Sequence, residues 1–468
     1  MSGQYEIGMV GLGVMGRNLV LNMADHGFSV AGFDKERSQV EAMRTEAEER
    51  PVLTVESPEE LVQSLRLPRA VMLLVPAGHI VDAVIGELTP LLDHGDMIID
   101  CGNSFFRDTS RRERELGEME IHFMGVGISG GEEGARYGPS IMPGGRAEAY
   151  ERVRPVFEAA AAQVGGAPCV AYLGPGAAGH YVKMVHNGIE YAIMQLIAEA
   201  YDLMRRGIGL NEAEMSGVFG GWSRGAAASF LLEITTDILA KVDDFTGNPL
   251  VNMIRDEARQ LGTGMWTSQD AMNLGVPSPA MDIAVAMRNL SALGGERRTA
   301  ADSLEGGPPA FSPDRDEFLA RLEDALYAAM ITAYAQGMAQ LRTASEKYGF
   351  GLDLEAVARI WRGGCIIRAA FLENIREAYR RQPGLPNLLL DAETGAEVLK
   401  RADSLGEVAA AAARLHLPAP AFMASLAYFD GYRSRRLPAN LVQAQRDYFG
   451  AHKYERTDAE GVFHTQWT

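Results

Sequence analysis

The most constraining feature of the sequence is a glycine pattern near its start, GxGxxG at residues 11–16. An apolar segment precedes it at residues 7–10, and a helical pattern follows at residues 17–26. A second apolar segment ends on Asp34, 18 residues after the last glycine. This order of strand, glycine turn, helix and acid-terminated strand is the fingerprint of a dinucleotide-binding βαβ unit. The alternative is a glycine turn in some other α/β fold.

The motif predicts a separate task for each glycine. Gly11 permits the tight turn, Gly13 lets the backbone approach a pyrophosphate, and Gly16 lets the helix pack closely on the strand. The helix N-terminus then faces the phosphates. We therefore expect a dinucleotide cofactor to contact Gly11, Gly13, Val14, Met15 and Gly16.

Asp34 indicates which dinucleotide is bound. A carboxylate at this position accepts hydrogen bonds from a ribose 2′-hydroxyl and repels a 2′-phosphate. The residue therefore favours NAD over NADP. Lys35 follows directly and would partly offset the repulsion.

The first third of the chain alternates apolar segments with helical patterns. The expected strands are residues 7–10, 29–33, 71–75, 97–100 and 122–125, and the expected helices include 18–26 and 59–65. Such alternation predicts a mostly parallel sheet. Residues 125–145 hold eight glycines and are expected to form a turn-rich segment.

The pattern changes after Gly174-Pro175-Gly176, where we expect a domain boundary. Beyond it the chain has long helical periodicity, for example over residues 179–204 and 318–341. We therefore predict an α/β Rossmann domain followed by a large all-α domain and a C-terminal tail. The expected bounds are 1–177, 178–430 and 431–468.

Charge restricts the partners of the chain. The net charge is −18, which argues against nucleic acid as the main partner. Residues 431–456 differ, because six basic residues face two acidic ones there, a balance of +4. Apolar residues are interleaved with these charges, so the tail is expected to bind a partner rather than form a solvated charged end. An anionic ligand is a natural candidate.

The remaining composition indicates a soluble cytoplasmic protein without a metal. The three cysteines lie far apart, which excludes a disulfide scaffold and fits a reducing compartment. No apolar run approaches 18 residues, and no basic segment precedes an apolar one at the start, so neither a membrane span nor a signal peptide is expected. The nine histidines show no metal-binding spacing.

A second constellation lies at residues 179–191. On a helix Lys183, Asn187 and Glu190 stand at i, i+4 and i+7 and share one face. A lysine, an amide and a carboxylate beside a dinucleotide site form an acid/base set. The alternative is a solvated face with ordinary ion pairs. Gly188, placed inside the helix, favours the acid/base set over the solvated face.

The glycine-rich segment at 127–138 could cradle a carboxylate, although alone it indicates only a loop.

These segments together resemble decarboxylating 6-phosphogluconate dehydrogenase. The resemblance runs from residue 5 to residue 467 and is carried by residues 11–16, 100–104, 129–140, 179–191, 361–368 and 437–452. It implies a Rossmann domain, a large helical domain and a homodimer in which each tail completes the active site of the partner subunit. It also implies oxidation of the C3 hydroxyl of 6-phosphogluconate, loss of CO2 and release of ribulose 5-phosphate.

The resemblance also implies roles for individual residues. Lys183 is the general base for the C3 hydroxyl, Glu190 is the general acid that protonates C1 of the enediol, and Asn187 lies between them. Asp34, Lys35, Val75, Ala77 and Asn103 join the glycine motif at the cofactor. The expected substrate residues are Asn103, Ser129, Gly130, Gly131, His186, Asn187, Tyr191, Thr263 and Arg288, with Arg446 and His452 supplied by the partner's tail. No metal is needed, because a β-keto acid decarboxylates readily when its ketone is polarised.

Four segments depart from the family pattern. Asp34-Lys35-Glu36 replaces Asn-Arg-Thr, and Pro76 replaces a lysine, so the cofactor site has fewer cations. Leu261 replaces a lysine that contacts the substrate phosphate. Residues 103–106 read Asn-Ser-Phe-Phe instead of Asn-Ser-Glu-Tyr.

The loss at position 261 opens an alternative substrate. A charge-assisted contact is worth about 1.5–3 kcal/mol. A sulfonate carries one negative charge where a phosphate carries nearly two. The alternative is therefore 6-deoxy-6-sulfogluconate, decarboxylated to 5-deoxy-5-sulfo-ribulose.

Two other classes of protein are disfavoured. The β-hydroxyacid dehydrogenases share the Rossmann half but are much shorter. A non-catalytic dinucleotide-binding module is disfavoured by the set of Lys183, Asn187 and Glu190.

Overall fold

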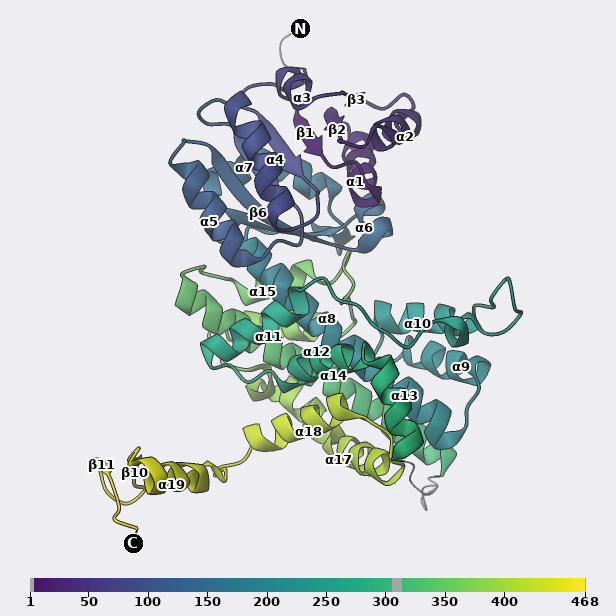
Figure 1. Cartoon of the computed structure of the whole chain (residues 1–468), viewed down its shortest axis with the longest axis vertical. Helices are drawn as coiled ribbons and strands as arrows, with labels where there is room; N and C mark the ends of the chain where they lie inside the picture. Colours follow the sequence, from purple (N-terminus) through teal and green to yellow (C-terminus); the bar gives the residue numbers. More distant parts are fainter. Residues whose placement is uncertain (1–3, 305–313, 468) are drawn as a thin grey trace.

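The computed structural model describes residues 4–304 and 314–467 of the chain. Figure 1 shows an α/β part at one end, a helical part below it and a C-terminal segment that extends to one side. The predicted fold class, a Rossmann domain followed by a large helical domain and a tail, is confirmed.

The α/β part is built on a seven-stranded sheet with the order β3-β2-β1-β4-β5-β6-β7. The strands are β1 (Ile7–Val10), β2 (Val30–Phe33), β3 (Val52–Thr54), β4 (Ala70–Leu73), β5 (Met97–Asp100), β6 (His122–Ser129) and β7 (Ser140–Gly145). All neighbours pair in parallel except β6 and β7. The strand order reverses between β1 and β4, and ligands of such sheets bind at that point, beyond the carboxyl ends of the strands.

Helices cover both faces of this sheet. They are α1 (Val14–Asp25), α2 (Arg37–Ala47), α3 (Pro58–Ser64), α4 (His79–Leu88), η1 (Thr89–Leu91), α5 (Phe106–Gly117), α6 (Gly131–Tyr137) and α7 (Ala147–Ala160). Successive side chains of a strand point to opposite faces. Accordingly Met97 and Ile99 of β5 join the core that contains α1 and α7, while Ile98 joins the core that contains α3, α4 and α5. A two-stranded ribbon, β8 (Gln163–Val164) with β9 (Ala167–Pro168), follows.

The prediction of a turn-rich segment over residues 125–145 is wrong. β6 continues to Ser129, and α6 and β7 follow. The glycines serve close packing: a Cβ on Gly127 would lie 2.3 Å from the Cβ of Lys183, and one on Gly179 would lie 2.2 Å from the carbonyl oxygen of Met142. The lack of a side chain at these glycines therefore lets the next long helix, α8, pack directly on the sheet.

The helical part is organised around two long helices. Its elements are α8 (Ala178–Asp202), η2 (Leu203–Gly207), α9 (Glu212–Trp222), α10 (Phe230–Ala240), η3 (Leu250–Met253), α11 (Thr263–Leu274), α12 (Pro279–Ser291), α13 (Gly294–Ser303), α14 (Arg315–Tyr348), α15 (Leu354–Ile360), α16 (Leu372–Arg381), η4 (Leu388–Leu390), α17 (Ala392–Arg414) and α18 (Pro420–Tyr432). α8 and α14 pack on each other and are buried on nearly every side. Polar side chains on α8 are therefore held inside the protein.

The C-terminal segment consists of α19 (Ala439–Gly450) and a short ribbon, β10 (Tyr454–Glu455) with β11 (Val462–Phe463). In Figure 1 it projects away from the helical part. Large apolar side chains of α19 are exposed there, among them Leu441, Tyr448 and Phe449.

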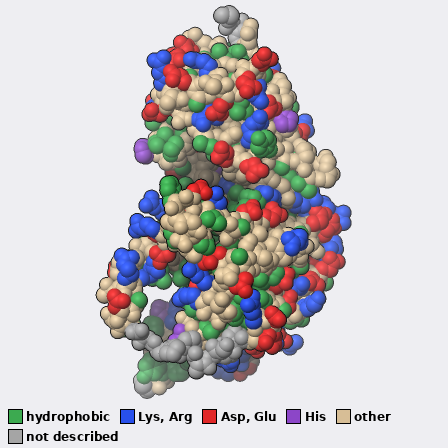
Figure 2. Space-filling model, turned by 90° about the vertical axis from the view of Figure 1, so that its right-hand side faces the viewer, with side chains coloured by type: hydrophobic (Ala, Val, Ile, Leu, Met, Phe, Trp, Pro, Cys, Tyr) green, Lys and Arg blue, Asp and Glu red, His purple; other side chains and the backbone are tan. Residues whose placement is uncertain are grey.

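On the face shown in Figure 2, acidic and basic side chains are interspersed, and a hollow separates the α/β half from the helical half. Within the described ranges, no helix combines the length and the apolar character needed to cross a membrane.

Candidate active site

The glycine turn between β1 and α1 has the geometry that the motif predicts. Gly11 has φ +99°, and a Cβ there would lie 2.4 Å from the carbonyl oxygen of Leu74. A Cβ on Gly16 would lie 1.9 Å from the carbonyl oxygen of Gly11, so the helix contacts the turn directly. Gly13 differs, because a Cβ on it would meet no atom within 4 Å. The protein's own packing does not require this glycine, and the open space fits a pyrophosphate that approaches the start of α1.

A cavity of about 600 Å³ adjoins this turn, at the point where the strand order reverses. Gly11 and Gly13 line it together with Asp34, Lys35 and Val75. Its other walls come from α4 and the end of β4, including Pro76, His79, Ile80, Ala83 and Glu87. These residues fit the adenosine half of a dinucleotide, since most of the wall is apolar and it includes a few polar groups.

Asp34 lies directly after β2 and holds the turn together. Its Oδ2 accepts a hydrogen bond from the backbone N–H of Leu12 at 2.7 Å, and its Oδ1 accepts one from the N–H of Glu36 at 2.9 Å. Both oxygens keep a further lone pair. The carboxylate is therefore fixed at the rim of the cavity and can still accept hydrogen bonds from a ribose.

Cations near this rim are paired with carboxylates. Nζ of Lys35 lies 2.7 Å from Oε1 of Glu87 on α4. Nε of Arg17 on α1 lies 3.1 Å from Oε1 of Glu46. Asp34, Glu36 and Glu87 thus make this end of the cavity acidic.

The loop after β5 holds Asn103 and is anchored by a network that the sequence did not indicate. Buried Asp100 accepts hydrogen bonds from the N–H of Gly102 at 3.0 Å and from Oγ of Ser104 at 2.6 Å. Arg112 of α5, also buried, donates to the carbonyl oxygen of Gly78 at 2.9 Å and to Asp82 at 2.8 Å. The Arg112 guanidinium lowers the pKa of Asp82 to about 2. The network ties the two cofactor loops to each other, and Asn103 is left exposed between them.

Lys183 lies on the part of α8 that packs against β6. Its side chain is only 6% exposed. Burial lowers the pKa of Lys183, although Glu190 and Cys365 act in the opposite direction. Burial also raises the pKa of Glu190, against the effect of Lys183 and Arg288. The lysine therefore loses its proton, and the carboxyl keeps its proton, more readily than either does in water.

Between these two residues α8 presents His186 and Asn187. Nδ1 of His186 lies 3.0 Å from Oδ1 of Asn187, and its Nε2 lies 3.2 Å from Oγ of Ser129. Nδ2 of Asn187 donates to Oγ1 of Thr263 at 3.0 Å. Burial, followed by Lys183, holds the pKa of His186 well below its usual value. The structure thus brings Ser129, Lys183, His186, Asn187 and Thr263 into one site.

Tyr191 and Arg288 extend this site by one turn of α8. The guanidinium carbon of Arg288 lies 3.5 Å from the ring centroid of Tyr191, and its Nη1 donates to the carbonyl oxygen of Arg259 at 3.0 Å. Gly188 is explained by α11, because a Cβ there would lie 2.5 Å from Cγ2 of Thr267. Close packing of α8 and α11 places Thr263 beside Asn187.

Gly130 and Gly131 join β6 to α6 with φ values of +122° and +64°. A Cβ on Gly130 would lie 2.6 Å from the carbonyl oxygen of Gly364. That same oxygen accepts a hydrogen bond from the N–H of Ser140 at 2.7 Å. The loop after α15, residues 361–368, thus supports the predicted substrate loop from behind, which the sequence alone did not indicate.

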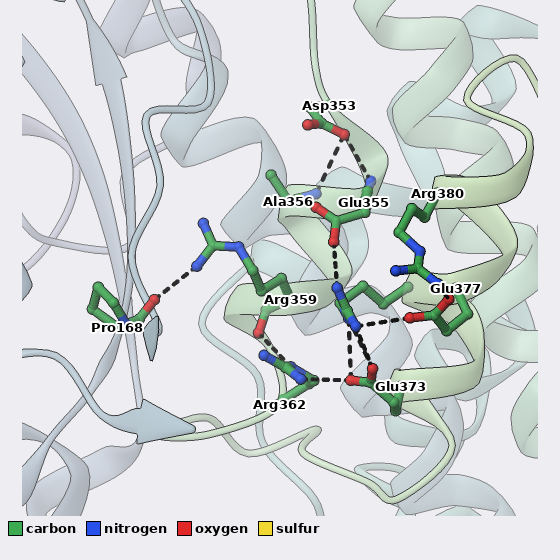
Figure 3. Close-up of polar contacts among 10 residues, drawn as sticks. Pro168, Asp353, Glu355, Ala356, Arg359, Arg362, Glu373, Glu377 and Arg380 are labelled. Atoms are coloured by element: carbon green, nitrogen blue, oxygen red, sulfur yellow. Dashed lines mark hydrogen bonds and ion pairs between the residues drawn. The ribbon is translucent and has the colours of Figure 1, made fainter. Parts of the chain in front are cut away.

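Figure 3 shows how the helices around this supporting loop are fixed. Asp353 caps α15 by accepting the N–H of Glu355 at 2.9 Å. Arg359 donates to the carbonyl oxygen of Pro168 at 2.9 Å, which connects α15 to the α/β part. Arg362 bridges the carbonyl oxygen of Arg359 and the carboxylate of Glu373 on α16.

Position 261, where the resembled family has a lysine, precedes α11. Leu261 is 87% exposed, two residues before buried Thr263. Phe105, at another departure, packs on Trp266 of α11 with ring centroids 4.9 Å apart. The Asn103 loop and α11 are therefore joined by an aromatic contact.

The structure does not bring Arg446 and His452 to this site. Both are exposed on the C-terminal segment, where Arg446 donates to Oε1 of Gln443 at 2.9 Å. That segment extends away from α8 in Figure 1. In the described residues, His, Cys, Asp and Glu side chains form no group of three or more that could hold a metal ion.

Comparison with known proteins identifies the family. Residues 6–174 match the NAD binding domain of 6-phosphogluconate dehydrogenase, and residues 179–467 match the 6-phosphogluconate dehydrogenase C-terminal domain. The chain is 50% identical over 467 residues to the NADP(+)-dependent, decarboxylating 6-phosphogluconate dehydrogenase of Bacillus subtilis, covering 99% of each chain. It is 52% identical over 466 residues to the decarboxylating enzyme of Synechococcus elongatus, with the same coverage.

A solved structure agrees with these relatives. The Plasmodium falciparum 6-phosphogluconate dehydrogenase, described in apo form and in complex with NADP+ and with 6-phosphogluconate, is 44% identical and has a TM-score of 0.95. The match covers 99% of this chain and 100% of that one. The predicted resemblance is therefore confirmed: the chain belongs to the decarboxylating 6-phosphogluconate dehydrogenase family.

Proposed function

We propose that the protein oxidatively decarboxylates 6-phosphogluconate to ribulose 5-phosphate and CO2, with NAD as the favoured oxidant. The observation that carries this proposal is the set on α8, where buried Lys183 and Asn187 and partly buried Glu190 share one helix face. Lys183 packs there against β6 of the dinucleotide-binding sheet. The names of the relatives, all decarboxylating dehydrogenases of this sugar acid, support the reaction.

Lys183 and Glu190 divide the proton transfers. NAD, held at the glycine turn and Asp34, would supply the hydride acceptor for C3 of the sugar acid. Neutral Lys183 takes the proton of the C3 hydroxyl, and burial favours that neutral form. The protonated lysine then polarises the new ketone, which lets the carboxylate at C2 leave as CO2. Glu190, whose pKa is raised by burial, donates a proton to C1 of the enediol.

The preference for NAD rests on the acidic rim of the cofactor cavity. Two relatives are described with NADP, so the nicotinamide dinucleotide class is common to the family. In this chain a 2′-phosphate would meet Asp34 and Glu36, while Lys35 is paired with Glu87. Repulsion between these carboxylates and a 2′-phosphate disfavours the binding of NADP.

We assign the C6 anion to a pocket of Tyr191, Thr263 and Arg288, with Asn103, Ser129, Gly130, Gly131, His186 and Asn187 holding the sugar acid. The exposed Leu261 favours a second candidate, 6-deoxy-6-sulfogluconate, because no lysine at that position awaits a doubly charged phosphate. The chemistry at C1 to C3 is the same for both substrates.

The C-terminal segment, residues 431–468, is proposed to complete the site of a partner subunit in a cytoplasmic homodimer. Residues 1–177 would then bind the cofactor and residues 178–430 the substrate and the second subunit. Support comes from the exposed apolar side chains of α19. Arg446 and His452 are also exposed, on the same segment that projects from the helical part in Figure 1.

Initial rates of NADH formation with 6-phosphogluconate and with 6-deoxy-6-sulfogluconate test the substrate. A higher kcat/KM for the phosphate supports the first candidate. A tenfold preference for the sulfonate, about 1.4 kcal/mol in transition-state binding, supports the second. No turnover with either, together with tight NAD binding, would mean a non-catalytic binding protein.

Mixed dimers test the exchange of tails. Subunits with Lys183→Met and subunits with Arg446→Ala are each defective alone, and they are unfolded and refolded together. Exchange predicts that activity returns, because one site of each mixed dimer combines an intact Lys183 with an intact partner tail. If each tail served its own subunit, mixing would restore nothing.

A further inference from the structure

The C-terminal segment is folded around one buried carboxylate, that of Asp447 on α19. Its side chain is fully withdrawn from solvent, whereas its neighbours Arg446 and Tyr448 are exposed. The segment projects from the helical part in Figure 1, and the groups that hydrogen-bond to the Asp447 side chain belong to the segment itself.

Four donors converge on this carboxylate. Oδ1 accepts the N–H of Lys453 at 2.9 Å and lies 2.9 Å from Nδ1 of His464. Oδ2 accepts the N–H of Thr465 at 3.1 Å and the indole N–H of Trp467 at 2.9 Å. Burial acts to raise the pKa of Asp447, but these hydrogen bonds lower it, so the group stays ionised. Hydrogen bonds to a charged acceptor are about twice as strong as neutral ones.

The same contacts fix the turn that follows α19. Ala451 and Lys453 have positive φ values of 49° and 64°, a conformation that non-glycine residues adopt only when their surroundings hold it. The backbone carbonyl of Asp447 accepts the N–H of Ala451 at 2.9 Å, and its side chain holds Lys453. His452 lies between these two anchored residues, and its ring is edge-on to Phe449 at 5.9 Å.

We propose that Asp447 is a positioning residue that fixes Arg446 and His452 relative to each other, so that the tail presents them as one anion-binding pair. Arg446 directly precedes Asp447, and His452 directly precedes the residue whose N–H the carboxylate accepts. Both the helix and the end of the chain are thereby tied to one group. This inference rests on the proposed exchange of tails.

Asp447→Asn tests the inference, because it keeps the shape and places an amide N–H among donors. KM for 6-phosphogluconate is expected to rise at least tenfold, with kcat within threefold and KM for NAD unchanged. Trp467 emission should shift to longer wavelength, and the other three tryptophans lie in the helical part. Asp447→Glu restores the charge and should recover part of the lost affinity.

Asp458→Asn is the matched control, since Asp458 lies in the same segment but is exposed and pairs with nearby Arg456. An unchanged KM in Asp447→Asn would overturn the inference. So would loss of the dimer with equal changes in kcat and both KM values, because that pattern indicates a merely structural role. Failure of the proposed function is separate: the unmodified protein would then not turn over the sugar acid. Failure of tail exchange alone is also separate, because the mixed dimers of Lys183→Met and Arg446→Ala subunits would then regain no activity.

Discussion

The carboxylate of Asp34 accepts a hydrogen bond from the backbone N–H of Leu12 at 2.7 Å, across the glycine turn that receives the cofactor. Its charge is thereby fixed at the rim of the cavity, where we propose that the ribose 2′ substituent lies. Asp34→Asn removes the charge and keeps an acceptor. We expect kcat/KM for NADP relative to NAD to rise about tenfold, or ~1.4 kcal/mol.

The matched control is Glu41→Gln on the exposed side of α2, where Glu41 pairs with Arg37. It should leave the ratio unchanged. An unmodified protein that prefers NADP, with no response to Asp34→Asn, would contradict this account of cofactor choice.

Lys183→Met should lower kcat by about 10³ while the Kd for NAD stays the same, because general base catalysis contributes about 10²–10⁴. Burial lowers the pKa of Lys183 from 10.5, and only the neutral amine acts as base. In the unmodified protein kcat/KM should therefore rise with pH and level off below pH 10.5. Lys400→Met on α17 serves as control. A variant that retains a tenth or more of kcat would exclude Lys183 as the base.

Leu261→Lys should raise kcat/KM for 6-phosphogluconate relative to 6-deoxy-6-sulfogluconate about tenfold or more. The physical reason is a new charge-assisted contact, worth about 1.5–3 kcal/mol and greatest for the doubly charged group. Leu399 is an exposed residue of α17, so Leu399→Lys adds the same charge elsewhere and should not change the ratio. If both variants behave alike, position 261 does not face the C6 anion.

Glu199 provides a pH-dependent contribution to stability. Its buried carboxylate accepts the N–H of Ala421 at 2.9 Å and that of Phe422 at 3.1 Å, at the start of α18. Burial raises the pKa of Glu199 from 4.5 to about 7. A raised folded pKa favours folding below the unfolded value and loses that effect as pH rises through 7.

The Glu199→Gln variant has no titrating group at this position. Its free energy of unfolding, relative to that of the unmodified protein, should therefore increase by about 3 kcal/mol between pH 4.5 and pH 8. Thermal unfolding at both pH values measures this, with exposed Glu346→Gln as control. Parallel pH profiles for the two proteins would show that Glu199 does not titrate in this range.

The sequence predicted the elements whose periodicity is undisturbed. The first strand was placed at its observed bounds, Ile7–Val10, and the long helix at 179–204 corresponds to α8. β7 was missed because its glycines resemble turn residues, although Gly144 is required by the contact with α8 and Gly145 by the contact with β6. β3 was missed because three half-buried residues carry too little pattern.

The site was predictable only where residues adjacent in sequence act together. Lys183, Asn187 and Glu190 share a helix face, so spacing alone indicated them. Buried Arg112, which ties two cofactor loops, lies in a strongly charged helix and has no local signal. The contact of Gly364 with Gly130 joins segments more than 200 residues apart, which no local pattern encodes.

The most direct test of the account is the product balance with 6-phosphogluconate labelled with ¹³C at C1 and NAD in excess. We predict one labelled CO2 and one ribulose 5-phosphate for each NADH formed, and loss of all three in Lys183→Met. Formation of NADH without labelled CO2 would contradict the assignment of Lys183 and Glu190 to an oxidative decarboxylation.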